Sequence, residues 1–133
     1  MNQIAHLPAT PSQTDDLAAF CKAAGDVLRL DILRVLRSDS FGVLELAQIF
    51  GMRQSGMSHH LKVLANAGLV STRREGNSIF YRRSLPVTEQ PWHRLHSQLL
   101  NELDSQPDDA QLQQAIAAVH AQPAELSRQF FAR

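Results

Sequence analysis

The sequence has little of what marks secreted, membrane or disulfide-bonded proteins. Its 133 residues include one cysteine, Cys21, so no disulfide framework can form within the chain. No apolar run approaches the ~18 residues that a membrane-spanning helix needs. The N-terminus lacks the basic start and long apolar stretch of a signal peptide. We therefore expect a soluble, cytoplasmic chain that makes no contact with a membrane.

Sequence signatures of enzyme active sites are missing as well. No serine, cysteine or carboxylate pair has a spacing that would create a catalytic triad or an acid–base dyad. No Gly-rich loop of the kind that binds phosphate groups occurs. We expect a protein that is not an enzyme and that carries no cofactor.

The formal net charge of zero argues at first against a nucleic-acid partner. The distribution of the charges reverses that conclusion. Residues 51–83 carry six arginines and lysines against one acid, Glu75, whereas residues 84–133 carry three against six. A segregated basic block of this kind is typical of a nucleic-acid-binding face.

Residues 44–83 form the centre of the sequence and predict a helix, a tight turn, a second helix and a hairpin. Gly51 can adopt the left-handed conformation that ends a helix over 44–50. In the second helix, over 54–67, Met57, Leu61 and Leu64 recur at spacings of 4 and 3 and form a buried stripe. Two strands, 69–74 and 78–83, follow around a tip at 75–77. The pattern predicts a mainly α fold with a small β-hairpin, a winged helix-turn-helix.

The second helix has a polar outer face and the hairpin is basic. Glutamine, serine and histidine side chains can hydrogen-bond base edges, and lysine suits a phosphate. One face of the hairpin should pack inward while the other carries guanidinium groups, so that it can lie along a DNA backbone or reach the minor groove. The predicted DNA-binding residues are Arg53, Gln54, Ser55, Ser58, His59, Lys62, Arg73, Arg74 and Asn77.

Further helices are predicted at 14–24, 26–37, 89–104 and 108–121, with a short strand at 41–43. In the second of these, Val27, Leu30, Leu33 and Leu36 should be buried. Apolar stripes on the first and third have no partner in the core and predict a twofold dimer interface. Its predicted residues are Leu17, Phe20, Cys21, Trp92, Leu95, Leu99 and Leu103. We expect a flexible arm over 1–12, a DNA-binding and dimerisation domain over 13–104, and a C-terminal helical extension over 105–133.

The run ELAQIFGMRQSGMSHHLKVLANAGLVSTRREGNSIFYR resembles the winged-helix core of the ArsR/SmtB repressors. The upstream run AAGDVLRLDILRVL resembles that family's second helix, and the resemblance covers residues 17–104. It implies a homodimeric repressor on a double-stranded, inverted-repeat DNA operator, released by an effector. Three positions depart from the family pattern: Val27 replaces a proline, Arg53 a capping serine, and Asn77 a basic wing-tip residue. Arg29 matches a frequent family arginine, for which we expect a structural ion pair with Asp26 or another acid and not a DNA contact.

The family's thiolate metal sensor aligns with Gly42 and Leu44, so soft-metal binding there is excluded and the effector is expected to be a small molecule that needs no thiolate. His93 and His96, three apart on one predicted helix, are weak metal candidates, because two ligands fall short of a closed site. A metal-responsive repressor that uses them is one alternative. A winged helix used only for protein association is the other, although the polar helix face lacks the apolar anchors expected of it.

The segment after Pro86 resembles the connector in ArsR-type regulators that carry a C-terminal S-adenosylmethionine-dependent methyltransferase-like domain. That resemblance implies that this chain is the DNA-binding part of a longer regulator, with a signal linked to S-adenosylmethionine. Phe130 and Phe131 form an apolar end with nothing yet to bury it. The alternative is that the last helices fold back on the dimer and end there.

Overall fold

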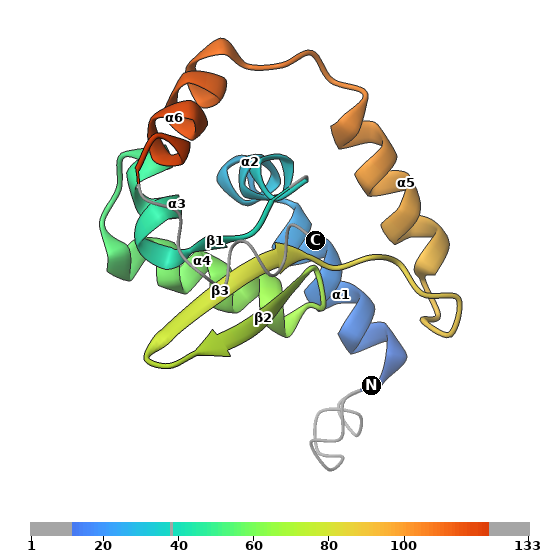
Figure 1. The fold of residues 1–133 in the computed structure, drawn as a ribbon. Coiled ribbons are helices and arrows are strands. Elements are labelled where there is room, and N and C mark those ends of the chain that lie inside the picture. The colour runs from blue at the N-terminus through green and yellow to red at the C-terminus, as the bar shows by residue number, and fades with distance from the viewer. Residues whose placement is uncertain (1–11, 38, 123–133) are drawn as a thin grey trace.

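The computed structural model describes residues 12–37 and 39–122 (Figure 1). Its helices and strands are α1 (Gln13–Ala24), α2 (Val27–Val35), β1 (Phe41–Gly42), α3 (Val43–Phe50), α4 (Gln54–Asn66), β2 (Val70–Glu75), β3 (Ser78–Arg83), α5 (His93–Asp104) and α6 (Ala110–His120). The strands form an antiparallel three-stranded sheet in the order β1-β3-β2. The predicted mainly α fold with a small hairpin is confirmed. The predicted N-terminal arm, apart from Ser12, and the final residues with Phe130 and Phe131 lie outside the described residues.

Short polar side chains fix where the helices begin. Ser12 and Asp15 form a reciprocal capping box at α1, with both hydrogen bonds at 3.1 Å. Asp26 and Asp109 cap α2 and α6 by accepting from the backbone N–H three residues ahead, each at 3.0 Å. At the end of α3, Gly51 adopts φ +62° and the following N–H of Met52 bonds back to the Ala47 carbonyl, as a tight interhelical turn requires.

The core lies where α1, α2, α3 and α4 meet the sheet. Its centre is formed by side chains that are fully buried, and the stripe predicted for α4 is among them: Ile32, Leu33, Phe41, Leu46, Met57, Leu61, Leu64 and Leu69. The strand at Phe41 pairs with β3 opposite Tyr81, which confirms the predicted third strand. The two helices of the helix-turn-helix and the hairpin therefore rest on one continuous apolar base.

Two helices differ most from the sequence prediction. α2 ends at Val35, and Val27 at its start is 78% exposed instead of belonging to the buried stripe, because the stripe shifts to Ile32, Leu33, Val35 and Leu36. α5 begins at His93 and not at Glu89, so Pro91 lies in the turns before the helix. Proline suits a first helical turn but it also suits a turn, and the sequence could not separate these.

The chain leaves α5, crosses over α2 and returns to place α6 beside α3 (Figure 1). Val119 of α6 is fully buried, and Gln122 Nε2 donates to Gln48 Oε1 of α3 at 3.2 Å. The connecting segment is tied down by Arg34 of α2, whose guanidinium donates to the Pro107 carbonyl at 2.7 Å. Residues 110–120 of the predicted extension thus pack on the helix-turn-helix itself.

Candidate nucleic-acid interface

Helix α4 is fixed in position by its inner face. Met57, Leu61 and Leu64 have no exposed surface, and α4 packs against α1, α2, α3 and β2. A polar contact adds to this packing, because Arg29 Nη1 of α2 lies 3.2 Å from His60 Nδ1. A helix held along one side in this way presents the opposite side at a fixed angle.

Arg29 ties three helices together. Its Nε donates to the Ala23 carbonyl at 2.8 Å and its Nη2 to the Lys22 carbonyl at 3.1 Å, both at the end of α1. Its guanidinium also lies 3.9 Å from Asp26, as predicted. The Arg29 backbone N–H and then its guanidinium lower the pKa of the Asp26 carboxyl, which keeps the α2 cap charged. Arg29 is therefore a structural residue, and its bond to His60 was not predicted.

The outer face of α4 is exposed over its whole length. All six residues predicted there are exposed: Arg53, Gln54, Ser55, Ser58, His59 and Lys62. Arg53 is the N-cap residue and makes no side-chain cap bond, as its departure from the family serine implied. The backbone N–H groups of the first turn then remain available, which suits a phosphate at the start of the helix.

The wing, which is the hairpin formed by β2 and β3, carries its charges on both faces. In the register of β2 with β3, Arg73 faces Phe80 across the strands and Arg74 faces Ile79. Residues directly opposite in an antiparallel pair share a face, so the two arginines point to opposite sides. The prediction that one face of the hairpin carries the guanidinium groups is wrong, because Arg73 and Arg74 are consecutive residues of β2 and both are exposed.

Arg73, Arg74 and Asn77 are exposed, and Arg73 also pairs with Glu75 at 2.9 Å. Gly76 turns the hairpin with φ +60°, whereas Asn77 keeps a negative φ. A positive φ at only the first central position is the pattern of a type II′ turn. Asn77 therefore stands at the wing tip with a short neutral side chain.

Arg83 is the last residue of β3 and one of the six basic residues of the 51–83 block, but its side chain points into the protein and away from the predicted DNA-binding face. Its guanidinium donates to both carboxylate oxygens of Asp104, at 2.9 and 2.7 Å, and to the Leu33 carbonyl at 3.2 Å. Its side chain is 10% exposed. These hydrogen bonds lower the pKa of the Asp104 carboxyl. The partner lies 21 residues ahead on α5, so no local signal in the sequence could have shown this.

The residues predicted for a dimer interface divide into two groups. Phe20 and Leu103 are buried within the chain, where the Phe20 ring packs against those of Trp92 and His96 at centroid distances of 6.3 and 5.5 Å. The others retain exposed surface, with Leu95 45% exposed and Cys21 exposed as well. A lone cysteine on an apolar stripe could have been a small core residue, and the structure shows that within one chain it is not.

The two weak metal candidates have separate environments. His93 Nδ1 lies 3.3 Å from the Gln90 carbonyl, while the buried His96 has its Nδ1 3.2 Å from Gln90 Oε1. Across residues 12–37 and 39–122, no group of three or more His, Cys, Asp or Glu residues is placed to hold a metal ion. Within the same residues, no helix combines the length and apolarity needed to cross a membrane.

The fold and the exposed α4 face define a winged helix-turn-helix protein. The model of the arsR family of bacterial regulatory proteins matches residues 26–72. HlyU of Vibrio cholerae, a transcriptional activator, is 36% identical over 80 residues, which is 58% of this chain and 74% of that protein. NmtR of Mycobacterium tuberculosis, an HTH-type transcriptional regulator, is 40% identical over 74 residues, or 56% of this chain and 62% of that protein.

Solved structures give the same result. The NMR structure of a homodimeric winged helix-turn-helix DNA-binding domain from Mycobacterium bovis, a possible ArsR-family regulator, has a TM-score of 0.57 and 28% identity, covering 76% of this chain and 94% of that one. This chain belongs to the ArsR family. It spans less than two thirds of the length of several relatives, with 62% for NmtR and 64% for an arsenical resistance operon repressor of Staphylococcus aureus.

Proposed function

We propose that the protein is a transcriptional repressor that binds double-stranded DNA through the outer face of α4. The observation that carries this proposal is the row of exposed, mostly hydrogen-bonding side chains on a helix whose other side is completely buried. An association surface would need apolar or aromatic anchors at those positions. The names of the relatives, which include both repressors and an activator, support a role in transcription.

The proposed contacts divide by chemistry. Gln54, Ser58 and His59 read base edges in the major groove, because each can donate and accept hydrogen bonds. Lys62 and the wing residues Arg73 and Arg74 hold phosphates. Since the wing has guanidinium groups on both sides and a neutral Asn77 at its tip, it lies along the backbone and does not insert deeply.

Two matched substitutions test this division. Ser58→Ala should relax the preference at one or two base pairs, with a loss of about 1–3 kcal/mol at those pairs only. Lys62→Ala should weaken binding to all sequences alike and reduce the salt slope by about 1. Binding measured over a set of single-base-pair variants of the operator, at several salt concentrations, separates the two. The same pattern for both variants would show that the roles are assigned wrongly.

We further propose that the protein acts as a C2 dimer on an inverted repeat. The remaining exposed side chains of α1 and α5, with Leu95 and Cys21 among them, would cover one another across the twofold axis. Two α4 helices would then lie about 34 Å apart, one turn of DNA. The homodimeric relative from M. bovis supports this assembly. A monomer at micromolar concentration in sedimentation, with full operator affinity, would contradict it.

The effector that releases the operator is proposed to be neither arsenite nor cadmium nor zinc. Gly42 and Leu44 stand where the family's thiolates would lie, and Leu44 is 64% exposed on α3. After dialysis, less than one equivalent of bound metal is expected. Stoichiometric zinc that dissociates the DNA complex would contradict this and point to His93 and His96.

A further inference from the structure

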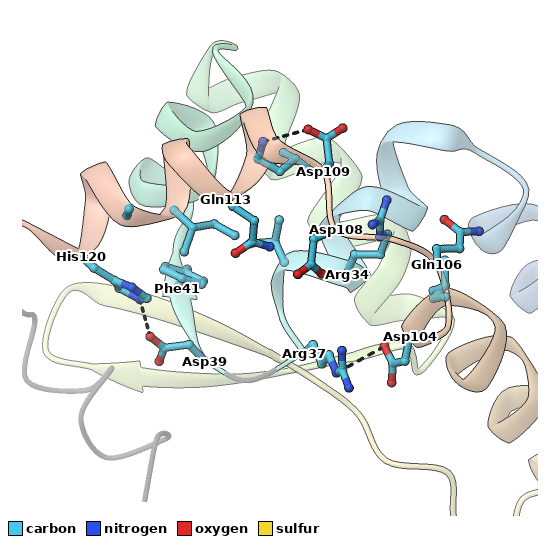
Figure 2. A pocket seen from close by; sticks show the side chains of 15 residues that line it. Arg34, Arg37, Asp39, Phe41, Asp104, Gln106, Asp108, Asp109, Gln113 and His120 are labelled. Atoms are coloured by element: carbon cyan, nitrogen blue, oxygen red, sulfur yellow. Dashed lines mark hydrogen bonds and ion pairs between the residues drawn. The ribbon is translucent and has the colours of Figure 1, made fainter.

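A cavity of about 590 Å³ opens between α2, α5 and α6 (Figure 2), and none of the described residues that line it belongs to α4, β2 or β3. Its walls come from the end of α2, from β1, from the end of α5 and from one side of α6. Pockets for small molecules commonly measure 300–1,000 Å³. The cavity is thus large enough for a compact organic molecule, and no function described above uses it.

The floor of the cavity is apolar. It is formed by Val35, Phe41, Leu103, Leu112 and Ile116, of which the first three are buried in the core. The imidazole of His120 stacks on the Phe41 ring, with centroids 5.6 Å apart and planes inclined by 21°. The stacked pair forms a flat edge to the floor, which suits the apolar body of a ligand.

The rim is acidic on balance. Four aspartates, residues 39, 104, 108 and 109, line it against two arginines, residues 34 and 37. Three of the aspartates already have partners. Asp104 is held by Arg83, Asp39 by His120 at 2.8 Å, and Asp109 by the N-terminus of α6.

Asp108 differs from these three, because within the described part of the chain its carboxylate has no hydrogen bond or ion pair. It stands beside the side-chain amide of Gln113, which reaches over the cavity (Figure 2). Of the arginines, Arg34 is engaged with Asp31 at 3.6 Å and with the Pro107 carbonyl. Arg37 is 58% exposed and lies 3.9 Å from Asp104. Among the described charged side chains of the rim, Asp108 is thus the one without a hydrogen bond or ion pair.

We propose that this cavity binds a small organic cation, an amine or amidine on an aromatic or aliphatic body. The apolar body would rest on the floor beside the Phe41–His120 pair, and the cationic head would meet Asp108 and the Gln113 carbonyl oxygen. A carboxylate ligand of the same shape is disfavoured, because it would face an excess of aspartates.

The walls of the cavity connect directly to the DNA-binding elements. The side of α6 that faces away from the cavity packs on α3, and Phe41 of the floor belongs to the strand that pairs with β3 of the wing. A ligand held between α6 and the ends of α2 and α5 therefore acts on α3 and the wing together. In this scheme the cation is the effector, a role that rests on the proposed DNA-binding function. Linkage then requires that operator DNA weaken cation binding by the same factor as the cation weakens DNA binding.

Calorimetry and methyl NMR on the full chain without DNA test the site itself. The probes are tryptamine and benzamidine as cations, and indole-3-acetate and benzoate as anions on the same rings. We expect saturable binding of the cations at up to millimolar concentration, at least about fivefold tighter than the anions. The Leu112 and Ile116 methyl signals should shift. No saturable shift from either cation, or no preference over the anions, overturns the proposal.

Two variants and one control locate the binding. Asp108→Asn should remove most of the preference for cations, and Ala117→Phe, which adds a ring at an exposed position of the wall, should block binding. Asp16→Asn, an exposed carboxylate in the first turn of α1, is the matched control and should bind as the original chain does. Equal losses in Asp16→Asn and Asp108→Asn would show unspecific charge attraction and would overturn the site.

A third measurement, of DNA binding with and without tryptamine, separates the two proposals. If the chain without ligand fails to bind DNA, the proposed function fails, while the calorimetric result on the cavity still stands. If DNA binds but tryptamine leaves its affinity unchanged, the assignment of the cation as effector is wrong. The expected result is a loss of DNA affinity at saturating tryptamine that Asp108→Asn reduces.

Discussion

The pair of Arg83 and Asp104 should be the strongest single polar contribution to the fold, and Asp104→Asn tests it. Two charge-assisted hydrogen bonds of 2.7 and 2.9 Å join the end of the wing to the end of α5, and the side chains are 10% and 25% exposed. A hydrogen bond to a charged group contributes about 1.5–3 kcal/mol. Asp104→Asn keeps one oxygen that can accept from Arg83, but it removes the negative charge and places an NH2 group opposite the second guanidinium donor. We expect a loss of about 2 kcal/mol in the free energy of unfolding.

Urea unfolding at neutral pH is the assay. Glu102→Gln, on the same helix but exposed, is the control and should change the unfolding free energy by less than about 0.5 kcal/mol. The double variant Arg83→Met with Asp104→Leu should recover part of the loss, because it leaves no unpaired charge behind. An Asp104→Asn chain as stable as the control would refute the role given to the pair.

The pH dependence of the same variant gives an independent check. Because the folded-state pKa of Asp104 is lowered, the unfolded chain takes up the proton first as the solution is acidified. The stabilisation is therefore complete above the ordinary pKa of 3.8 and is lost as pH falls from there through the folded-state value. The stability difference between the original chain and Asp104→Asn should shrink over that window.

Two further predictions concern single residues. Burial, and after it the charge of Arg83, lowers the pKa of His96, so the free energy of unfolding should fall as pH drops from 6.5 towards the folded-state pKa. His96→Gln should flatten this pH dependence in unfolding measured from pH 7.5 to about 5. An unchanged slope would contradict the assignment. Gly51→Ala should lower the free energy of unfolding by about 1 kcal/mol through the φ of +62° alone, since nothing lies within 4 Å of the added carbon. A stability equal to that of the original chain in urea unfolding would show that the turn relaxes.

Local patterns in the sequence were enough to predict the helix-turn-helix. The stripe of Met57, Leu61 and Leu64 and the left-handed turn at Gly51 depend on residues close together in the chain. The short apolar run at Phe41 is local as well, although its partner strand, at Tyr81, is distant in the sequence. The exposure of the α4 outer face follows from the same periodicity. These features were predictable because a helix or a turn is specified over a few residues.

Long-range contacts were not predictable in this way. The partner of Arg83, the bond between Arg29 and His60, and the docking of α6 on α3 join residues distant in the sequence. The apolar spacing predicts that Val27 is buried, but Val27 is the first residue of α2 and its side chain is exposed. The cavity has the same origin, since its lining residues come from α2, β1, α5 and α6, which are far apart in the sequence.

The central claim is that the α4 face and the wing bind DNA, and a salt titration tests it most directly. The affinity of the full chain for a random DNA duplex should fall linearly with the logarithm of salt concentration, with a slope of about −0.9 for each phosphate neutralised. Changing Lys62, Arg73 and Arg74 together to alanine should reduce that slope by about 3, whereas Arg94→Ala, an exposed arginine on α5, should leave it unchanged. Equal slopes for both variants, or no DNA binding at low salt, would contradict the account.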